Sequence, residues 1–197
     1  MKKKIAFFDF DGTITKKDTL LEFIKFNQGA LRLYFGFLLH SPWLVAYKLK
    51  IISNQAAKEK VLEFFFGKMN FDLFQERCNQ FADDIVPGLV RPKALEEIKK
   101  LQNNGVSVVI VTSSPENWIS NWAGMVQAKL IGTRLEIKEG RVTGKIIDKN
   151  CHGKEKVKRI QEEYDLSQYD EIYAYGDTAG DKPMLSLANF PFMKPFR

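Results

Sequence analysis

Three short and largely apolar segments lie far apart along the chain, and polar residues follow closely after each of them. They are residues 5–8, 106–111 and 171–175. An apolar run without polar alternation is typical of a strand that is buried on both faces of a parallel sheet. We therefore predict three parallel strands, each ending where the polar residues begin.

The long segment between the first two strands has helical spacing. Between residues 19 and 82, apolar side chains recur at intervals of three and four, and no strand is expected there. Pro87 and Gly88 mark a boundary, after which a further helix is predicted to begin near Pro92 and to stop at Gly105. The apolar positions that define the helical faces are Leu20, Ile24 and Leu31, then Phe74, Cys78, Phe81 and Ile85, and finally Leu95, Ile98 and Leu101.

A β-hairpin and a helix are predicted between the second and third strands. Residues 130–137 and 141–147 flank Glu139 and Gly140, which suit a tight turn, and residues 155–164 carry Val157 and Ile160 on one helical face. Strands separated by helices imply right-handed βαβ crossovers. The predicted fold class is therefore α/β: a Rossmann-like parallel-sheet core of residues 1–15 and 86–197, with an inserted α-helical cap domain over residues 16–85.

Composition excludes several classes of protein. The 197 residues are 45% hydrophobic and 27% charged, unlike disordered or collagen-like chains. Cys78 and Cys151 are far apart, so we expect neither a disulfide framework nor a thiolate zinc site, and we predict a reducing, cytoplasmic location. No signal peptide is expected, because acidic residues interrupt the first apolar run.

Positive charge and phenylalanine are concentrated in the predicted cap. The formal net charge is +6, and ten of the 16 Phe residues lie between positions 16 and 85. Positive charge suits an anionic partner, but no basic and aromatic motif supports nucleic-acid binding, and no nucleic-acid partner is expected. The aromatic stripe over residues 31–52 is interpreted either as cap core or as a surface for peripheral membrane contact. The oligomeric state stays open.

The residues that follow the strands are those that bind metals and phosphates. In an open parallel sheet, the ligand crevice lies beyond the carboxyl ends of the strands. Carboxylates and hydroxyls at one edge, with a lysine nearby, describe a site for a divalent cation and a phosphate. These residues are Asp9, Asp11, Gly12 and Thr13 after the first strand, Thr112, Ser113 and Ser114 after the second, and Gly176, Asp177 and Asp181 after the third.

Such a set of side chains suits a two-step phosphoryl transfer. One carboxylate could attack phosphorus to form an aspartyl-phosphate, and a second, Asp11, could protonate the leaving oxygen and then deprotonate the attacking water. Mg²⁺ held by two or three carboxylates would offset the repulsion between the anionic nucleophile and the anionic substrate. Thr112, free backbone N–H groups of Ser113 and Ser114, and a lysine ammonium would bind the phosphoryl oxygens.

Several segments resemble the motifs of the haloacid dehalogenase superfamily. FFDFDGTIT over residues 7–15 resembles its motif I, VVIVT ending at Thr112 its motif II, and GDTAGD over residues 176–181 its motif IV. The helical insertion between motifs I and II, EGRVTG over residues 139–144 and DKPML near the end resemble the phosphoserine phosphatase-like subfamily. The motifs stand in the family's order, and the likeness spans nearly the whole chain.

The resemblance implies a magnesium-dependent phosphomonoesterase that uses an aspartyl-phosphate. Asp9 would be the nucleophile and a Mg²⁺ ligand. Asp11 would be the general acid and base and would also ligate through its backbone carbonyl. Asp177 would be the third protein ligand, and Asp181 would support the metal shell.

The phosphate-binding residues implied by the resemblance are less sharply fixed. Thr112 would bind phosphate together with one lysine, for which HGKEKV offers both Lys154 and Lys156. The basic run over residues 154–159 is otherwise interpreted as a mostly solvated helix face. The further candidates for substrate contact are Gly12, Thr13, Asp18, Ser113 and Ser114.

The resemblance leaves the substrate open between a soluble and a lipid phosphate. Phosphoserine phosphatases carry a glutamate shortly after motif I, where this chain has Asp18, which could instead cap a helix. They also use a cap arginine, whereas residues 50–70 contain lysines and no arginine. A related branch acts on phosphatidylglycerophosphate and has an apolar cap. The alternative functions are a phosphotransferase or mutase that uses the same aspartyl-phosphate, and a non-catalytic phosphate-binding module.

Overall fold

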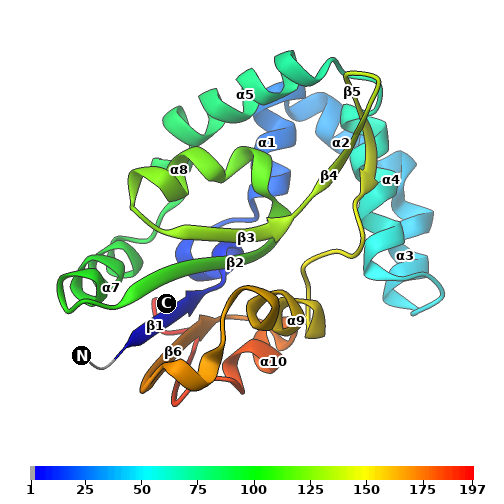
Figure 1. Ribbon diagram of the computed structural model, residues 1–197. Helices are drawn as coiled ribbons and strands as arrows, with labels where there is room; N and C mark the ends of the chain where they lie inside the picture. Colours follow the sequence, from blue (N-terminus) through cyan, green and yellow to red (C-terminus); the bar gives the residue numbers. More distant parts are fainter. Residues whose placement is uncertain (1–2) are drawn as a thin grey trace.

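The computed structural model describes residues 3–197, with the backbone alone at Leu44. Its centre is a five-stranded sheet in the order β3-β2-β1-β6-β7, in which all neighbouring strands are parallel (Figure 1). The three strands predicted from the sequence are the three central ones, so the α/β fold class is confirmed. The strands are β1 (Lys4–Phe8), β2 (Ser107–Pro115), β3 (Lys129–Thr133), β6 (Glu171–Gly176) and β7 (Phe190–Met193).

The register of the central strands brings their carboxyl ends to one edge. Phe8 of β1 lies opposite both Ile110 of β2 and Tyr175 of β6. Because the strands are parallel, the residues that follow these three positions meet at the same edge of the sheet. Asp9, immediately after Phe8, lies in the middle of this edge.

Helices cover both faces of the sheet. On one face α7 (Pro92–Asn103) and α8 (Ser120–Met125) contribute to a hydrophobic cluster, and on the other α9 (Lys154–Glu163) and α10 (Lys182–Leu185) contribute to a second. The predicted helices at Pro92 and at residues 155–164 are confirmed to within one or two residues. Short 3₁₀ turns complete this part of the chain at Glu116–Trp118, Leu166–Gln168 and Ala179–Asp181.

Every regular element described between β1 and β2 is helical, as the spacing predicts. A tight turn over Phe10–Ile14 leads into the insertion, which lies to one side of the carboxyl edge (Figure 1). Its helices are α1 (Thr19–Gln28), α2 (Ala30–Leu39), α3 (Ser41–Lys48), α4 (Asn54–Phe66), α5 (Phe71–Asp84) and the short α6 (Val86–Leu89).

The predicted hairpin is correct at its turn but wrong in its first strand. Residues 130–137 do not form one strand, because their first part belongs to β3 of the main sheet. Only β4 (Leu135–Lys138) pairs with β5 (Arg141–Ile146) in a separate antiparallel sheet. That ribbon packs on α4 at Gly144, where a Cβ would lie 2.3 Å from the Cα of Glu63. The inserted helices therefore contact a hairpin that comes from the far part of the chain.

The outer strand β7 was not predicted. Its sequence, FPFM, contains Pro191, which cannot donate a hydrogen bond to a ladder and which weighs against a strand in a sequence pattern. In the structure β7 is at an edge of the sheet and pairs on one side only, with β6. An edge position tolerates proline, and this explains the discrepancy.

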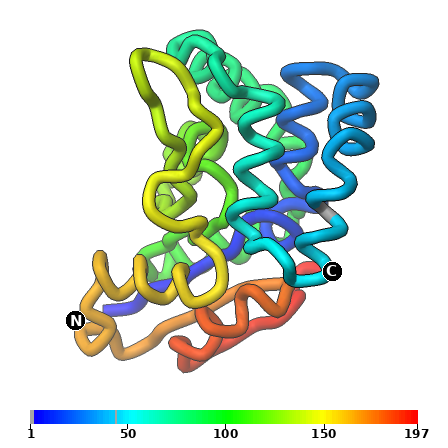
Figure 2. The backbone as a smooth tube through the Cα atoms, turned by 90° about the vertical axis from the view of Figure 1, so that its right-hand side faces the viewer, coloured from blue at the N-terminus to red at the C-terminus, as the bar shows by residue number. Residues whose placement is uncertain are grey.

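Nine of the ten phenylalanines of the insertion lie in the hydrophobic cluster that covers one face of the sheet or pack against it, and Phe35 is exposed. Phe23 of α1 is fully buried, and its ring centroid is 4.8 Å from that of Trp118. Phe66, Phe74 and Phe81 surround the Phe23 ring within the same cluster that covers one face of the sheet. The aromatic residues of α2 and α3 lie mostly outside this cluster, on the outer helices at the right of Figure 2.

None of the helices described in residues 3–197 combines the length and the apolar character that crossing a bilayer requires. A turn at His40 divides the apolar residues 33–47 between α2 and α3.

Candidate active site

Gly12 allows the loop after β1 to approach the loop after β6. Its φ is +82°, in the left-handed region that favours glycine. A Cβ at this position would lie 2.5 Å from Oδ2 of Asp177. The glycine predicted as a phosphate contact therefore lies against one of the predicted metal ligands.

Asp9 is buried at the end of β1 and both of its carboxylate oxygens are bonded. Oδ1 lies 2.6 Å from Nζ of Lys156, and Oδ2 accepts a hydrogen bond of 2.8 Å from Oγ1 of Thr13. Burial raises the pKa of Asp9 to about 7, although the Lys156 charge opposes the rise. A bound cation beside this carboxylate would lower its pKa and favour the ionised form near neutral pH.

The structure distinguishes clearly between the two candidate lysines. Lys156 is 1% exposed, and its ammonium lies 2.6 Å from Oδ1 of Asp9 and 2.8 Å from Oδ1 of Asp181. Burial by itself lowers the pKa of Lys156. The two carboxylates raise the pKa by more than burial lowers it, so the net pKa is above the usual value. Lys154 is exposed and contacts neither carboxylate. Only Lys156 therefore belongs to the cluster at the sheet edge.

The interpretation of the basic run as a solvated face holds for only part of it. Lys154 and Lys158 are exposed, whereas Lys156 and Arg159 are buried. Arg159 donates to the backbone carbonyls of Gly132 and Lys149, and so joins α9 to the end of β3. Lys156 and Arg159 lie on the face of α9 that packs on the core. The sequence shows only that the segment is basic and does not show which of its residues face inward.

Asp181 is held in place by backbone groups as well as by Lys156. Its Oδ2 accepts hydrogen bonds from the backbone N–H of Asp177 and from the N–H and Oγ1 of Thr178. Burial alone would raise the pKa of Asp181, but Lys156 and these donors hold it below its usual value. The side chain is therefore an ionised and rigid part of the cluster.

Asp9, Asp177 and Asp181 together form a donor set that suits a hard divalent cation. One oxygen from each lies within 4.8 Å of the others, and Mg²⁺ prefers a few carboxylate oxygens with water completing the shell. Oδ1 of Asp177 is buried and has no hydrogen-bond partner among the described residues. Such an unpartnered oxygen is costly, and a bound cation would satisfy it. On its other oxygen, Asp177 already contacts the guanidinium of Arg197.

Asp11 lies outside this carboxylate cluster and on the cavity side of the loop. Its Oδ1 accepts from the backbone N–H and the hydroxyl of Thr19, both at 2.7 Å. Its Oδ2 accepts from Oγ of Ser114 at 2.6 Å. The side chain is thus fixed between the start of α1 and the end of β2, and only its backbone carbonyl is left as a predicted metal ligand.

One part of the prediction for the residues after β2 is wrong: the backbone amide of Ser114 is not free. Oγ1 of Thr112 accepts a hydrogen bond of 3.0 Å from the backbone N–H of Ser114, so that amide is not free for phosphate as predicted. The carbonyl of Ser113 accepts from Nζ of Lys58 at 2.5 Å. Thr112 is fully buried at the sheet edge, and its hydroxyl can still donate.

A cavity of about 260 Å³ opens between the sheet edge and the inserted helices. Asp18 and Lys58 are its charged residues apart from Asp11. Asp18 caps α1 through hydrogen bonds from the backbone N–H groups of Leu20 and Leu21, so the helix-cap alternative for Asp18 is confirmed in the structure. The other lining residues are Leu20, Leu21, Phe37, Tyr47, Asn54, Ala57, Val61, Ser113, Ser114 and Asn150.

Lys58 and Asn150 are site residues that the sequence analysis did not single out. Burial lowers the pKa of Lys58 to about 8, with Asp11 and Asp18 opposing the change. The only related signal in the sequence was that residues 50–70 contain lysines but no arginine, so any cation from this segment had to be a lysine.

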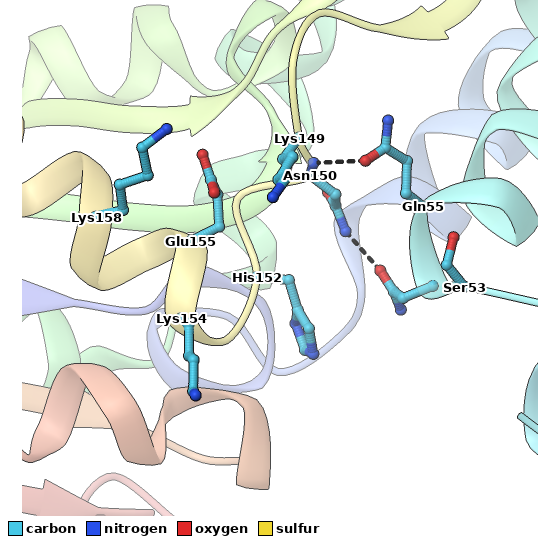
Figure 3. Close-up of a pocket in the computed structure, with 9 residues that line it drawn as sticks. Ser53, Gln55, Lys149, Asn150, His152, Lys154, Glu155 and Lys158 are labelled. Carbon is cyan, nitrogen blue, oxygen red and sulfur yellow. Dashed lines mark hydrogen bonds between the residues drawn. The ribbon is translucent and has the colours of Figure 1, made fainter.

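A second pocket of about 570 Å³ lies on the other side of Asn150. Figure 3 shows Asn150 hydrogen-bonded to Gln55, with Lys154 and Lys158 extending from α9 at the opposite wall. Lys154 therefore belongs to this second pocket, away from the buried carboxylates.

Comparisons with known proteins agree with this geometry. The chain is 35% identical to the protein CicA of Caulobacter vibrioides over 192 residues, covering 96% of this chain and 85% of that protein. It is 30% identical to a probable phosphatase of Mycobacterium tuberculosis over 188 residues, 91% of this chain and 64% of that one.

The fold also matches solved structures. A structure described as a phospho-aspartyl intermediate analogue of phosphoserine phosphatase superposes with a TM-score of 0.68 at 18% identity, covering 95% of this chain and 84% of that one. Residues 6–186 match the sequence family described as haloacid dehalogenase-like hydrolase. This protein therefore belongs to the haloacid dehalogenase-like hydrolase family.

Proposed function

We propose that this protein is a magnesium-dependent phosphomonoesterase that forms an aspartyl-phosphate on Asp9. The observation that carries the proposal is the buried cluster in which Lys156 joins Asp9 and Asp181 beside the unpartnered oxygen of Asp177. Asp9, Asp177 and the backbone carbonyl of Asp11 would hold Mg²⁺, and Asp181 would support that shell. The bound ion would supply Lewis-acid stabilisation of the phosphoryl charge.

The reaction divides into two displacements at phosphorus. A carboxylate oxygen of Asp9 attacks, the bond from phosphorus to the ester oxygen breaks, and the leaving oxygen takes a proton from Asp11. Water then attacks the same phosphorus and gives its proton to Asp11. The bond to Asp9 breaks, inorganic phosphate leaves, and both aspartates return to their starting states.

Lys156 and Thr112 are the proposed phosphate-binding groups. The pKa of Lys156 stays above its usual value, so its ammonium remains charged while the phosphoryl group passes between oxygens. A fixed charge in a buried site stabilises such a transfer more strongly than the same charge in water. The hydroxyl of Thr112 adds a neutral donor at the same edge of the sheet.

The cavity favours an ester whose leaving group carries apolar and anionic parts. Leu20, Phe37 and Tyr47 supply apolar walls, and Lys58 supplies the only cation of the lining. Asp18, which stands where phosphoserine phosphatases bind the substrate amine, is engaged in capping α1. These features support a lipid-like or otherwise amphiphilic phosphate over phosphoserine.

Two of the comparisons support the reaction class. The matched protein of Mycobacterium tuberculosis is named a probable phosphatase, and the matched phosphoserine phosphatase structure is described as a phospho-aspartyl intermediate analogue. Neither name determines the substrate of this chain.

The test is release of inorganic phosphate from a panel of esters, measured with Mg²⁺ and with the chelator EDTA. The panel contains an aryl phosphate, phosphoserine, sugar phosphates, nucleotides and dispersed phosphatidylglycerophosphate. We expect Mg²⁺-dependent release that Asp9→Asn abolishes and that Asp83→Asn, at an exposed position, leaves unchanged. Full activity of Asp9→Asn would contradict the mechanism. Transfer of phosphate to an added alcohol in place of water would indicate a phosphotransferase.

A further inference from the structure

Helices α2 and α3 carry a large exposed apolar surface. Leu31 is 88% exposed, Leu38 73% and Ile51 71%. Together with their exposed apolar neighbours these residues form what we name the α2–α3 face. Its members are Leu31, Tyr34, Phe35, Leu38, Leu39, Trp43, Val45, Leu49 and Ile51. Large exposed apolar surfaces usually mark a site of contact with another molecule or with a membrane.

The sequence of α2 is apolar on both sides, although only one side is packed. Its one fully buried residue is Gly36, where a Cβ would lie 2.3 Å from the ring of Phe65 in α4. Close approach at Gly36 fixes the inner side of α2 on α4. Apart from Arg32, the exposed residues of α2 are leucine, tyrosine and phenylalanine, where a water-facing helix would carry mostly charges.

The charged residues within the segment that carries this face all have one sign. No aspartate or glutamate occurs in residues 23–58, between Glu22 and Glu59, whereas this segment contains five basic residues. Four of them are exposed: Lys25, Arg32, Lys48 and Lys50. An apolar centre with a positive surround is complementary to an anionic lipid surface, in which acyl chains lie beneath negative headgroups.

The same charges weigh against a second copy of the chain as the occupant. A two-fold contact would place this surface against itself, so its cations would face like charges and no acidic residue of the segment would compensate them. The exposed aromatic residues fit the lipid alternative. Tyr34 and Trp43 have amphipathic rings of the type that lie at headgroup level.

Helices α2 and α3, which carry this face, also contribute Phe37 and Tyr47 to the lining of the 260 Å³ cavity. Tyr47 of α3 is 38% exposed and also lines the cavity, as does Leu21 of α1 at 39%. On the inner side the same cavity reaches Asp11 and Ser114 at the sheet edge. A surface that rests against the α2–α3 face is therefore adjacent to the entrance of the proposed active site.

We propose that the α2–α3 face docks the protein onto the surface of an anionic lipid bilayer, with the helices lying in the interface. None of the described helices could span the bilayer, so the contact is peripheral. The docking stands independently of the enzymatic activity, but its consequence, that an amphiphilic phosphate enters the cavity from the bilayer, rests on the proposed function.

The experiment is flotation of the full chain with vesicles of phosphatidylcholine, with and without phosphatidylglycerol. We expect flotation with anionic vesicles that weakens as salt is raised. The double variant Leu31→Glu/Leu38→Glu places charge in the apolar contact. Its affinity for these vesicles should be lower than that of the parent by about tenfold or more. The matched control Leu73→Glu/Met125→Glu changes exposed apolar residues elsewhere and should bind as the parent does.

A second readout follows the interface directly. Trp43 is 45% exposed, whereas Trp118 and Trp122 are buried, so brominated lipid should quench fluorescence from Trp43 and the quenching should disappear in Trp43→Phe. The variant Lys48→Gln/Lys50→Gln should lose affinity for anionic vesicles, unlike the control Lys93→Gln/Lys99→Gln on α7.

Several results would overturn the proposal. One is failure of the parent chain to float with anionic vesicles, and another is equal binding by Leu31→Glu/Leu38→Glu. A dimer in sedimentation that the double variant dissociates, with no vesicle binding, would identify a second copy as the occupant. Hydrolysis of the soluble aryl phosphate is measured in parallel and should be unchanged in the docking variants. Loss of docking and loss of the proposed function are thereby distinguished.

Discussion

The ammonium of Lys156 lies 2.6 Å from Oδ1 of Asp9, although 147 positions separate the two residues in sequence. The contact joins the end of β1 to the first turn of α9, and a further bond of 2.8 Å extends it to Asp181 after β6. Three distant segments are thus held around one buried charge. This arrangement keeps two carboxylates together in a place where they would otherwise repel each other.

Removal of the Lys156 charge is expected to affect both stability and catalysis. Lys156→Met would leave Asp9 and Asp181 buried without their cation, and losing one partner of a buried ion pair costs roughly 3–5 kcal/mol. Urea denaturation should show this loss in the free energy of unfolding, and phosphate release should fall to background. The control Lys154→Met, two positions away and exposed, should change stability by less than about 0.5 kcal/mol. The account fails if Lys154 proves to be the essential lysine.

Gly12 is predicted to matter for its lack of a side chain more than for its backbone angle. In Gly12→Ala the added Cβ would meet Oδ2 of Asp177 at 2.5 Å, so the apparent affinity for Mg²⁺ and the rate should both fall. Gly140→Ala has a similar φ of +69° with nothing within 4 Å. Both variants should lose about 1 kcal/mol of stability from backbone strain. Activity titrated against Mg²⁺ should separate them, and equal activities would refute this interpretation.

Lys58 is predicted to bind the substrate rather than to take part in the chemical step. It lines the cavity together with Asp11 and Asp18, whereas Asp9, Asp177 and Asp181 are not among the lining residues. Lys58→Met should raise KM for an anionic substrate by about tenfold, the effect of losing one charge-assisted contact, with a smaller change in kcat. Lys60→Met, two positions further along α4, is the matched control. A loss confined to kcat would assign Lys58 to catalysis.

The same lysine predicts a pH dependence of substrate binding. Burial lowers the pKa of Lys58 to about 8, so the ammonium is charged below that pH and neutral above it. KM for an anionic substrate should therefore rise as the pH increases through 8. In Lys58→Arg the guanidinium stays protonated, and this rise should disappear. A KM profile that is the same in the parent and in Lys58→Arg would show that another group titrates.

The fold and the carboxylates at the sheet edge could be predicted because they depend on local patterns. Unbroken apolar runs identify strands buried on both faces, and parallel strands end at a common edge. Asp9, Asp11, Asp177 and Asp181 were found from that rule alone. The outer strands were harder, because the sequence of residues 130–137 does not show where β3 ends and β4 begins, and the pairing with β2 and with β5 decides it.

The remaining site residues depend on contacts between distant segments. Whether Lys154 or Lys156 points inward is set by which face of α9 packs on the sheet, and both positions carry the same residue type. The ammonium of Lys58 is held at the cavity by a hydrogen bond to the carbonyl of Ser113, which is 55 positions away in sequence. Sequence spacing within α4 contains no sign of that partner, so the residue could not be selected in advance.

The central claim, covalent catalysis by Asp9, is tested most directly by trapping the intermediate. The enzyme is mixed with substrate and Mg²⁺, quenched in acid within the first turnover, and digested for mass spectrometry. A phosphoryl group should be found on the peptide that contains Asp9, acid-stable and lost on treatment with hydroxylamine, as an acyl phosphate is. A phosphoryl group on another residue, or steady turnover with no phosphorylated peptide at any quench time, would contradict the account.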